Sequence, residues 1–421
     1  MAGRRNLIAL FSAFLLMVFG SSLQSTLLAV RAGIEGFPSA TTGLMMAGFF
    51  FGYAGGSVLT VEILQRVGYI RTFAALASVA STVALLHGIF VFPPAWALLR
   101  FAFGICYSGM VLIVESWLNA ESGNSQRGQV LALYGVLFML ASGSAQFGLL
   151  LAESEGLLLF AAVSVLLSLS LLPTSLMAIS EPETTAYRRL TFIRLYRISP
   201  FGTGGVVFAG LATGGFWTLA PRFVQDSGLG EGSVALFMSL AIAAGALAQW
   251  PFGLISDKVD RRLVILLAFI GTAIFSAFIS LFGRAAGGIN LYLGSAGFGV
   301  FALPLYSLCL AHINDHLRWE ELVPATSAVV LLFGVASGAG SALAGLAMDI
   351  LGPPGLYGLA ALTSGIFLVY GNALLRRREP IVSPQKRLFQ YVPRTTQGAA
   401  RFLRTRAEER EQRPTGDFKP E

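Results

Sequence analysis

Apolar stretches of about 20 residues recur along the whole chain, and this feature constrains the fold most strongly. A helix of that length crosses the ~30 Å hydrocarbon core of a bilayer. Inside lipid the backbone must satisfy its own hydrogen bonds, so such stretches fold as helices. The composition agrees, because only 12% of the residues are charged, against about 25% in soluble domains. The sequence therefore predicts an all-α integral membrane protein.

A polar segment at residues 180–200 divides the apolar stretches into two groups of six. We predict an N-terminal six-helix bundle (1–179), a cytoplasmic linker (180–200), a C-terminal six-helix bundle (201–375) and a basic, disordered cytoplasmic tail (376–421). The linker is expected to lie on the membrane surface or to dock a partner. The twelve predicted spans are 7–29, 42–64, 72–92, 95–118, 129–152, 157–179, 201–221, 233–255, 263–283, 290–312, 325–348 and 355–375.

The distribution of Lys and Arg predicts the orientation of these spans. With both termini in the cytoplasm, 25 of the 29 basic residues fall on the cytoplasmic side, and 12 of those 25 belong to the tail. Basic residues gather in cytoplasmic loops, so both termini are expected there. We predict a multi-pass protein of the cytoplasmic (inner) membrane that contacts membrane lipid, with the basic tail either disordered or loosely bound to anionic lipid.

The two groups of spans repeat each other. The loop after the second span contains Gln65, and the loop after the eighth contains Asp257, which lies 192 residues further on. A repeated six-span half is a transporter architecture, in which the substrate binds between the halves near the membrane midplane. The repeat therefore predicts two pseudo-symmetric six-helix bundles.

Short motifs within the repeat resemble those of the major facilitator superfamily. The loop after the eighth span is similar to the motif G-x3-D-[RK]-x-G-[RK]-[RK], with Asp260 where glycine is usual. The loop after the second span is a weaker copy, in which Gln65 stands in place of the acidic residue. The residues that carry the two copies are Gln65, Arg66, Gly68 and Arg71 in the first and Gly253, Asp257, Lys258, Asp260, Arg261 and Arg262 in the second.

Further strings narrow the resemblance. Arg100 and Gly104 in the fourth span are similar to the superfamily motif R-x3-G. The strings 115–119 (ESWLN), 249–253 (QWPFG) and 311–315 (AHIND) resemble the YcaD-like branch. The resemblance implies a permease of twelve helices. It also implies that Arg100 faces the central cavity, where it binds an anionic group or tunes a proton-carrying partner. The alternative is an arginine that snorkels to the outer interface.

Carboxylates near the ends of the fourth and tenth spans are candidates for gating. We predict that Glu115 and Asp315 accept hydrogen bonds from the basic motif loops and close the cytoplasmic side in the outward-open state. Each could instead cap a helix, and Glu115 could carry a proton. His312 lies three residues from Asp315, so the two could form a proton relay or a local hydrogen bond. The predicted gating partners are Glu115, Asn119, His312, Asn314 and Asp315.

The spans that would line a central cavity carry aromatic and amide side chains. Such groups suit an uncharged or weakly polar organic solute, although each could also serve helix packing. The candidate cavity residues are Gln24, Tyr107, Tyr134, Gln146, Trp217, Gln249, Trp250 and Tyr306.

The sequence contains no metal-ligand spacing of His or Cys and no phosphate-binding loop. We therefore expect a protein that is not an enzyme, has no metal or cofactor, does not bind nucleic acid and is a monomer. The leading hypothesis is a secondary active transporter that moves a small organic solute by alternating access, coupled to H⁺. The alternative is a sensor or scaffold of the same fold that uses its basic tail and does not turn over solute.

Overall fold

The computed structural model describes residues 2–122, 127–175, 191–283, 288–318 and 321–376, together with positions 388, 389 and 392. Throughout these residues the secondary structure is helical, without strands. The first half contains α1 (Ala2–Ile34), α2 (Ser39–Val67), α3 (Tyr69–Ile89), α4 (Pro93–Glu121), α5 (Arg127–Ser144), the 3-10 helix η1 (Ala145–Leu151), α6 (Leu158–Leu169) and α7 (Leu171–Ser175). The second half contains α8 (Phe192–Ile198), α9 (Pro200–Asp226), α10 (Glu231–Lys258), α11 (Arg261–Phe282), α12 (Ile289–Ala302), α13 (Leu305–Asn314), α14 (Leu322–Leu351) and α15 (Gly355–Leu375).

Twelve helical segments in the described residues are long and apolar enough to cross a membrane, which confirms the predicted fold class. Several helices extend beyond their predicted spans, because their polar ends continue the helix past the apolar stretch. Three spans consist of two pieces. The tenth, for example, is interrupted at Pro304, which cannot donate a backbone hydrogen bond and precedes α13.

The repeat is visible in the helix boundaries. Helix α2 begins at Ser39 and α10 begins at Glu231, and 231 minus 39 is 192. The same offset separates the first residues of α3 and α11, Tyr69 and Arg261. The 192-residue repeat that the loops predict therefore extends over the surrounding helices.

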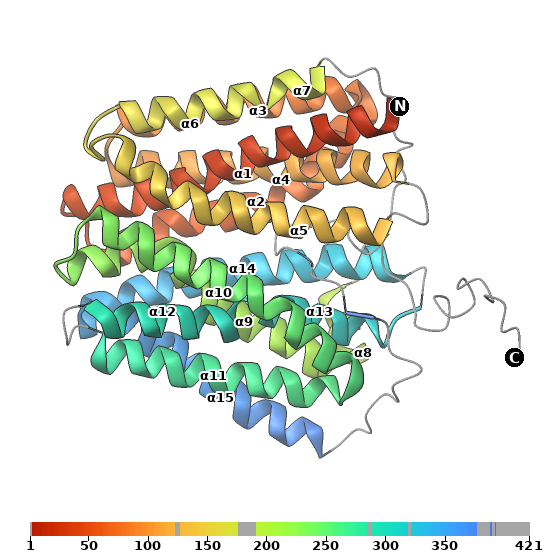
Figure 1. The fold of residues 1–421 in the computed structure, drawn as a ribbon, viewed down its shortest axis with the longest axis vertical. Coiled ribbons are helices and arrows are strands. Elements are labelled where there is room, and N and C mark those ends of the chain that lie inside the picture. Colours follow the sequence, from red (N-terminus) through yellow and green to blue (C-terminus); the bar gives the residue numbers. More distant parts are fainter. Residues whose placement is uncertain are drawn as a thin grey trace, which may run out of the picture.

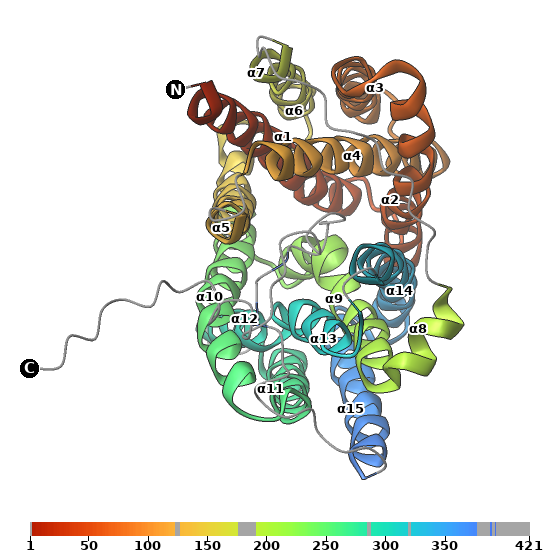
Figure 2. The same cartoon turned by 90° about the vertical axis from the view of Figure 1, so that its right-hand side faces the viewer.

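The helices form two groups, α1–α7 and α8–α15, which lie against each other (Figures 1 and 2). Helix α2 packs against α14, α1 against α9 and α5 against α10 along the seam between the groups. We call the end of the bundle that holds Asn6, Val67 and Lys258 the N-terminal face, which points toward the viewer in Figure 2. The other end, which holds Ile34, Pro93 and Leu351, is the opposite face.

Helices α5 and α10 show how the two groups diverge. Toward the opposite face they touch, and Ser239 Oγ donates a hydrogen bond to the Gly143 carbonyl oxygen at 2.8 Å. Toward the N-terminal face a pocket of about 320 Å³ lies between them, with Leu131 on α5 and Asp257 on α10 among its lining residues. The groups are therefore in contact at one face and separated at the other along this seam.

Of the predicted linker, residues 180–190 lie outside the described residues. Helix α8 occupies most of the remainder, with Thr191 as its N-cap. Leu195 is completely buried, and Arg194 forms an ion pair of 2.5 Å with Glu321. This part of the linker is packed against the second group of helices.

Candidate functional site

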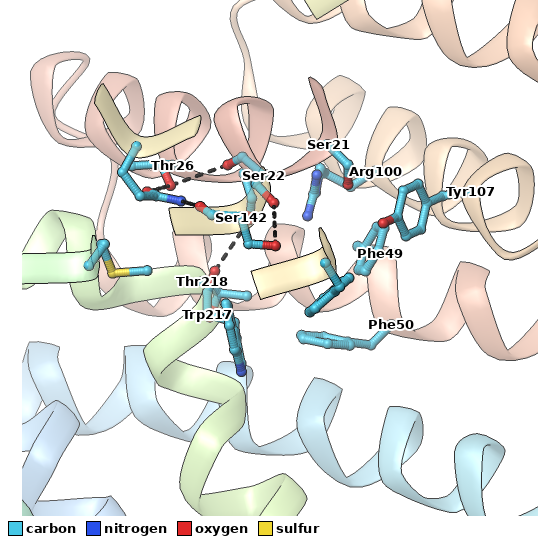
Figure 3. Close-up of a pocket in the computed structure, with 14 residues that line it drawn as sticks. Ser21, Ser22, Thr26, Phe49, Phe50, Arg100, Tyr107, Ser142, Trp217 and Thr218 are labelled. Carbon is cyan, nitrogen blue, oxygen red and sulfur yellow. Dashed lines mark hydrogen bonds between the residues drawn. The ribbon is translucent and has the colours of Figure 1, made fainter. Parts of the chain in front are cut away.

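A polar cavity lies between the two groups of helices and contains about 50 Å³ of free space (Figure 3). A cavity of this size holds only a few water molecules. Helices α1, α2, α4, α5 and η1 contribute from the first group, and α9 and α10 from the second. The lining residues are Ser21, Ser22, Ser25, Thr26, Phe49, Phe50, Arg100, Tyr107, Phe138, Ser142, Gln146, Trp217, Thr218 and Met238.

Glycine contacts between α2 and α4 set the position of Arg100. A side chain at Gly104 would overlap the Phe49 carbonyl oxygen, and one at Gly52 would overlap the Phe101 carbonyl oxygen. The two backbones can approach this closely only because both positions lack a Cβ atom. Arg100 lies seven residues after Pro93, the first residue of α4, which is roughly 10 Å along the helix. Gly104, the glycine of the R-x3-G motif, thus lets α4 approach α2, and this approach places Arg100 beside Phe49.

The guanidinium of Arg100 is buried and directed into the cavity (Figure 3). Its Cζ lies 4.7 Å from the Phe49 ring centroid and 5.9 Å from that of Phe103. Nε and Nη1 have no hydrogen-bond partner, and no described carboxylate lies within ion-pair distance. The prediction that Arg100 faces the cavity agrees with this placement, whereas a snorkelling arginine would be exposed.

Hydroxyl and amide groups form the other side of the cavity. Thr26 Oγ1 donates to Gln146 Oε1 at 2.6 Å, and Gln146 Nε2 donates to the Ser142 carbonyl oxygen at 2.8 Å. Ser22 Oγ donates to Ser142 Oγ at 3.2 Å. These bonds join α1 to the region where α5 becomes η1, and they fix polar groups opposite the aromatic side chains.

The structure places the predicted cavity residues in different environments. Tyr107, Gln146 and Trp217 line the cavity. Gln24 does not, because it is buried with its Nε2 3.4 Å from His87 Nδ1. Tyr134 is buried as well, and its hydroxyl donates to Glu115 Oε1 at 2.8 Å.

The remaining three cavity candidates lie nearer the N-terminal face. Tyr306 lines a second pocket, which contains Phe138 and Trp217 as well and so adjoins the central cavity. Gln249 and Trp250 line the larger pocket between α5 and α10. Trp250 is 73% exposed, so it packs on the helix surface rather than in the cavity.

The second motif loop forms a charged cluster at the N-terminal face. Arg261 is buried and donates to Asp257 Oδ1 and Asp315 Oδ2, both at 2.8 Å. Lys258, at the end of α10, is exposed. Asp315 thus contacts a motif arginine within the second group of helices, and its role in closing this face stays a prediction.

The structure also explains why Asp260 can stand where the motif has glycine. Its φ of −57° suits any residue, and its side chain caps α11 by accepting from the Arg262 backbone N–H at 3.0 Å. It also pairs with the Arg262 guanidinium at 2.7 Å. In the first loop the equivalent residue is Gly68, whose φ of +83° favours glycine.

The first motif loop has a different environment. Gln65, Arg66 and Arg71 are exposed, and neither arginine side chain forms a hydrogen bond or ion pair with another described residue. Glu115 is instead buried beside Tyr134. The predicted lock between this loop and Glu115 belongs to the outward-open state. In the described structure α5 and α10 touch toward the opposite face and are separated toward the N-terminal face.

The other predicted gating partners surround the end of α13. Asn314 is buried, and His312 is buried with its ring centroid 5.4 Å from Phe201 and 4.7 Å from His316. Asn119 lies on the last turn of α4, and its Oδ1 is a buried atom without a partner.

Two residues that the sequence did not single out join the groups at the opposite face. Arg222 Nη1 donates to the Phe37 carbonyl oxygen at 2.5 Å and to Thr42 Oγ1 at 3.1 Å. Asp349 accepts from the backbone N–H groups of Ser39 and Ala40 at 2.8 and 2.9 Å, which satisfies the first turn of α2. Both residues are charged and lie near apolar spans, where a charge is costly, and this could have marked them as candidates. Their partners lie in the other half of the chain.

The third unpredicted feature is the packing of two residues from the predicted tail. Phe389 N–H donates to Asp257 Oδ1 at 2.9 Å, and the Val392 carbonyl oxygen accepts from Ser307 Oγ at 3.1 Å. Val392 is buried. Most of the predicted tail (376–421) lies outside the described residues, and these two positions lie against the second group of helices.

Comparisons with known proteins agree with this architecture. A family model described as Major Facilitator Superfamily matches residues 202–408. The uncharacterized MFS-type transporter YcaD of Salmonella typhimurium is 26% identical over 372 residues, which cover 87% of this chain and 94% of that protein. YcaD of Escherichia fergusonii is 23% identical over 367 residues, with the same coverage. These matches make the chain similar to the major facilitator superfamily. It resembles the YcaD branch over most of its length, as the three short strings predict.

Solved structures show the same fold. The nucleoside transporter NupG superimposes with a TM-score of 0.74 at 11% identity, covering 89% of this chain and 98% of that chain. A bacterial homolog to the human lysosomal transporter Spinster, in its inward-facing and occupied conformation, gives a TM-score of 0.68 at 14% identity, covering 87% of this chain and 94% of that chain. These likenesses, with the twelve apolar helices of the described residues, support a multi-pass membrane transport protein.

Proposed function

We propose that the chain is a secondary active transporter of the cytoplasmic membrane that moves a small organic solute by alternating access, driven by H⁺, with both termini in the cytoplasm. The polar cavity between the two groups of helices carries the proposal. It lies between repeated halves, where transporters of this architecture bind substrate. In this orientation the N-terminal face is cytoplasmic.

Alternating access requires that the opposite face can open. Beside the close packing of α2 on α14, polar contacts across that face join Arg222 and Asp349 in the second group to residues 37–42 in the first. Such contacts can break and reform at a modest cost in free energy, so both conformers stay accessible.

Cross-linking tests the alternating movement. Gly33 and Gln225 are adjacent across the opposite face, since a Cβ at Gly33 would contact the Gln225 side chain. Solutes that raise the Tm of the purified protein would be tested for counterflow in proteoliposomes. Joining Gly33→Cys to Gln225→Cys with a short reducible cross-linker should stop counterflow, and reduction should restore it. Counterflow that continues in the cross-linked protein, or that is absent for every stabilising solute, contradicts the proposal and favours a sensor or scaffold.

Glu115 supports proton coupling, because it is a buried carboxylate within a membrane-spanning helix and intramembrane carboxylates commonly serve proton relays. Glu115→Gln should abolish uptake driven by a pH gradient while counterflow continues. Glu121→Gln is the matched control, since Glu121 is on the same helix and bonds to Asn6 near the N-terminal face. Gradient-driven uptake that survives Glu115→Gln contradicts a coupling role for this residue.

A further inference from the structure

Two buried arginines face the interior of the protein, and their environments differ. Arg222 is 8% exposed, and its donors are engaged by Ala32, Phe37, Thr42 and Asp226. Arg100 is 2% exposed, yet Nε and Nη1 have no partner, and no ion pair with a described residue neutralises it. Its described contacts are with the Phe49 and Phe103 rings.

A buried cation without a counter-charge is costly, because the protein interior does not replace the water that solvated it. The aromatic rings recover only part of that cost. The cost is offset if a ligand brings the missing negative charge. Arg100 lines the central cavity, so a ligand that enters this cavity can reach it.

We propose that the solute of this transporter carries a singly charged carboxylate that binds Arg100, with an apolar part against Phe49, Tyr107 and Trp217. This inference rests on the proposed function, since it names the substrate class of the same cavity. A carboxylate matches the planar fork of a guanidinium. A single arginine surrounded by neutral serine and threonine hydroxyls suits one negative charge better than the two of a phosphate monoester.

The test compares carboxylates with their uncharged amides. The Tm of the purified protein would be measured with acetate, benzoate and 3-phenylpropionate, and with acetamide, benzamide and 3-phenylpropionamide, at constant ionic strength. A ligand that binds only the folded state raises the Tm. At least one carboxylate should stabilise the wild type, its amide should not, and Arg100→Met should remove the difference.

Arg222→Met is the matched control, because it removes a buried arginine that the protein already satisfies. Without ligand, Arg222→Met should lower the Tm, whereas Arg100→Met should leave it unchanged or raise it. Arg100→Gln provides a polar replacement if the methionine variant does not fold. Amides that stabilise as well as their acids, carboxylate effects that persist in Arg100→Met, or the absence of any carboxylate effect overturn the inference.

Counterflow separates this inference from the proposed function. Transport of a neutral solute that does not depend on Arg100 leaves the function intact and removes the anion site. Carboxylate binding that depends on Arg100 but occurs without turnover leaves the site intact and removes the function.

A second, independent observation concerns Phe389 and Val392. Three pockets follow one another from the central cavity toward the N-terminal face. The central cavity and the second pocket share Phe138 and Trp217, and the second and third share Met139. Val392 lines the second pocket, and Phe389 lines the third.

Both residues are held by named contacts. The Phe389 ring occupies the space above Gly253, where a Cβ would overlap it, and its N–H is bonded to Asp257. Val392 is 2% exposed and bonded to Ser307 through its carbonyl oxygen. In the third pocket about 320 Å³ remains free, but only about 20 Å³ remains around Val392. Val392 therefore occupies the narrow part of this route.

We infer that Phe389 and Val392 act as an autoinhibitory plug between the central cavity and the N-terminal face. The glycine of the superfamily motif, Gly253, creates the space for Phe389. Neither Phe389 nor Val392 belongs to a helix of the described residues, so the plug can leave without unfolding one.

The test uses Thr213→Cys, which places a thiol in the second pocket beside Val392. A charged maleimide added to the purified protein should label this thiol slowly. Combining Phe389→Ala with Val392→Gly should accelerate labelling about tenfold or more, which corresponds to about 1.4 kcal/mol of lost contact. Leu388→Ala is the control and should leave the rate unchanged. A rate that is already high with the intact segment, that does not rise in the double variant, or that rises equally in Leu388→Ala overturns the plug.

Discussion

Arg222→Met should shift the protein away from the conformer in which the opposite face is closed. Arg222 lies on α9, and its Nη1 bonds to the Phe37 carbonyl oxygen and Thr42 Oγ1 in the other group of helices. Both bonds must break when this face opens. Its bond to Asp226 lies within α9 and survives opening, so it does not contribute to the difference between conformers.

The size of this shift follows from the hydrogen bonds that Arg222 makes to the other group of helices. A hydrogen bond from a charged donor contributes about 1.5–3 kcal/mol. Taking about 2–3 kcal/mol for the shared Nη1 donor, the substitution should change the ratio of closed to open molecules by a factor of roughly 30–150. Methionine keeps an unbranched apolar side chain at this position, so the loss is chiefly one of hydrogen bonds.

Distance measurements between spin labels would detect this shift. Ile34→Cys and Gly230→Cys place labels on exposed positions of the two groups at the opposite face, in a background without Cys106 and Cys309. Arg222→Met should add a longer distance to the distribution. Arg31→Met is the control, since Arg31 bonds to Glu35 and Glu155 within its own group. An unchanged distribution in Arg222→Met, or the same change in Arg31→Met, refutes the reasoning.

Three further substitutions test individual contacts. Gly104→Ala should destabilise the protein by several kcal/mol, because the new Cβ would overlap the Phe49 carbonyl oxygen, whereas Gly55→Ala meets open space and should not lower the Tm. Arg261→Met should cost about 3–5 kcal/mol of stability, because it leaves the carboxylates of Asp257 and Asp315 facing each other; a Tm equal to that of the wild type would show that the cluster is not structural. Tyr134→Phe should cost about 1–3 kcal/mol by removing the hydroxyl that bonds to Glu115, and Tyr370→Phe, whose hydroxyl bonds to Tyr196 and Pro200 nearer the surface, should cost less in the same thermal denaturation assay.

The membrane helices could be predicted from the sequence because hydrocarbon thickness imposes one length on every span. The positions at which the helices end were harder to predict. Helix α9 continues to Asp226, well past its predicted end at residue 221, because Pro221 lies inside the helix without ending it. Neighbouring helices can satisfy the backbone groups that a proline frees in a membrane helix, and a single sequence does not show those neighbours.

A site residue could be predicted from the sequence where burial of its side chain is costly and therefore needs a specific reason. Arg100 is such a case, since a charge in a span points to a cavity or an interface. Gln24 and Tyr134 were not, because an amide or a phenol can satisfy itself against another helix as readily as it can line a cavity. Their partners, His87 and Glu115, are decided by helix packing, which local spacing does not encode.

The repeat also explains why the charges divide as they do. At the 192-residue offset, the charged residues Asp257, Arg261, Arg222 and Asp349 correspond to Gln65, Tyr69, Val30 and Leu157 in the first half. Conversely, Arg100 corresponds to Tyr292 in the second half. The backbone repeat is thus retained while these charges are not: Asp257, Arg261, Arg222 and Asp349 belong to the second half, and the cation that faces the cavity belongs to the first. Substitutions at the second-half positions should therefore change the balance of conformers, whereas substitutions at Arg100 should change which solute is bound.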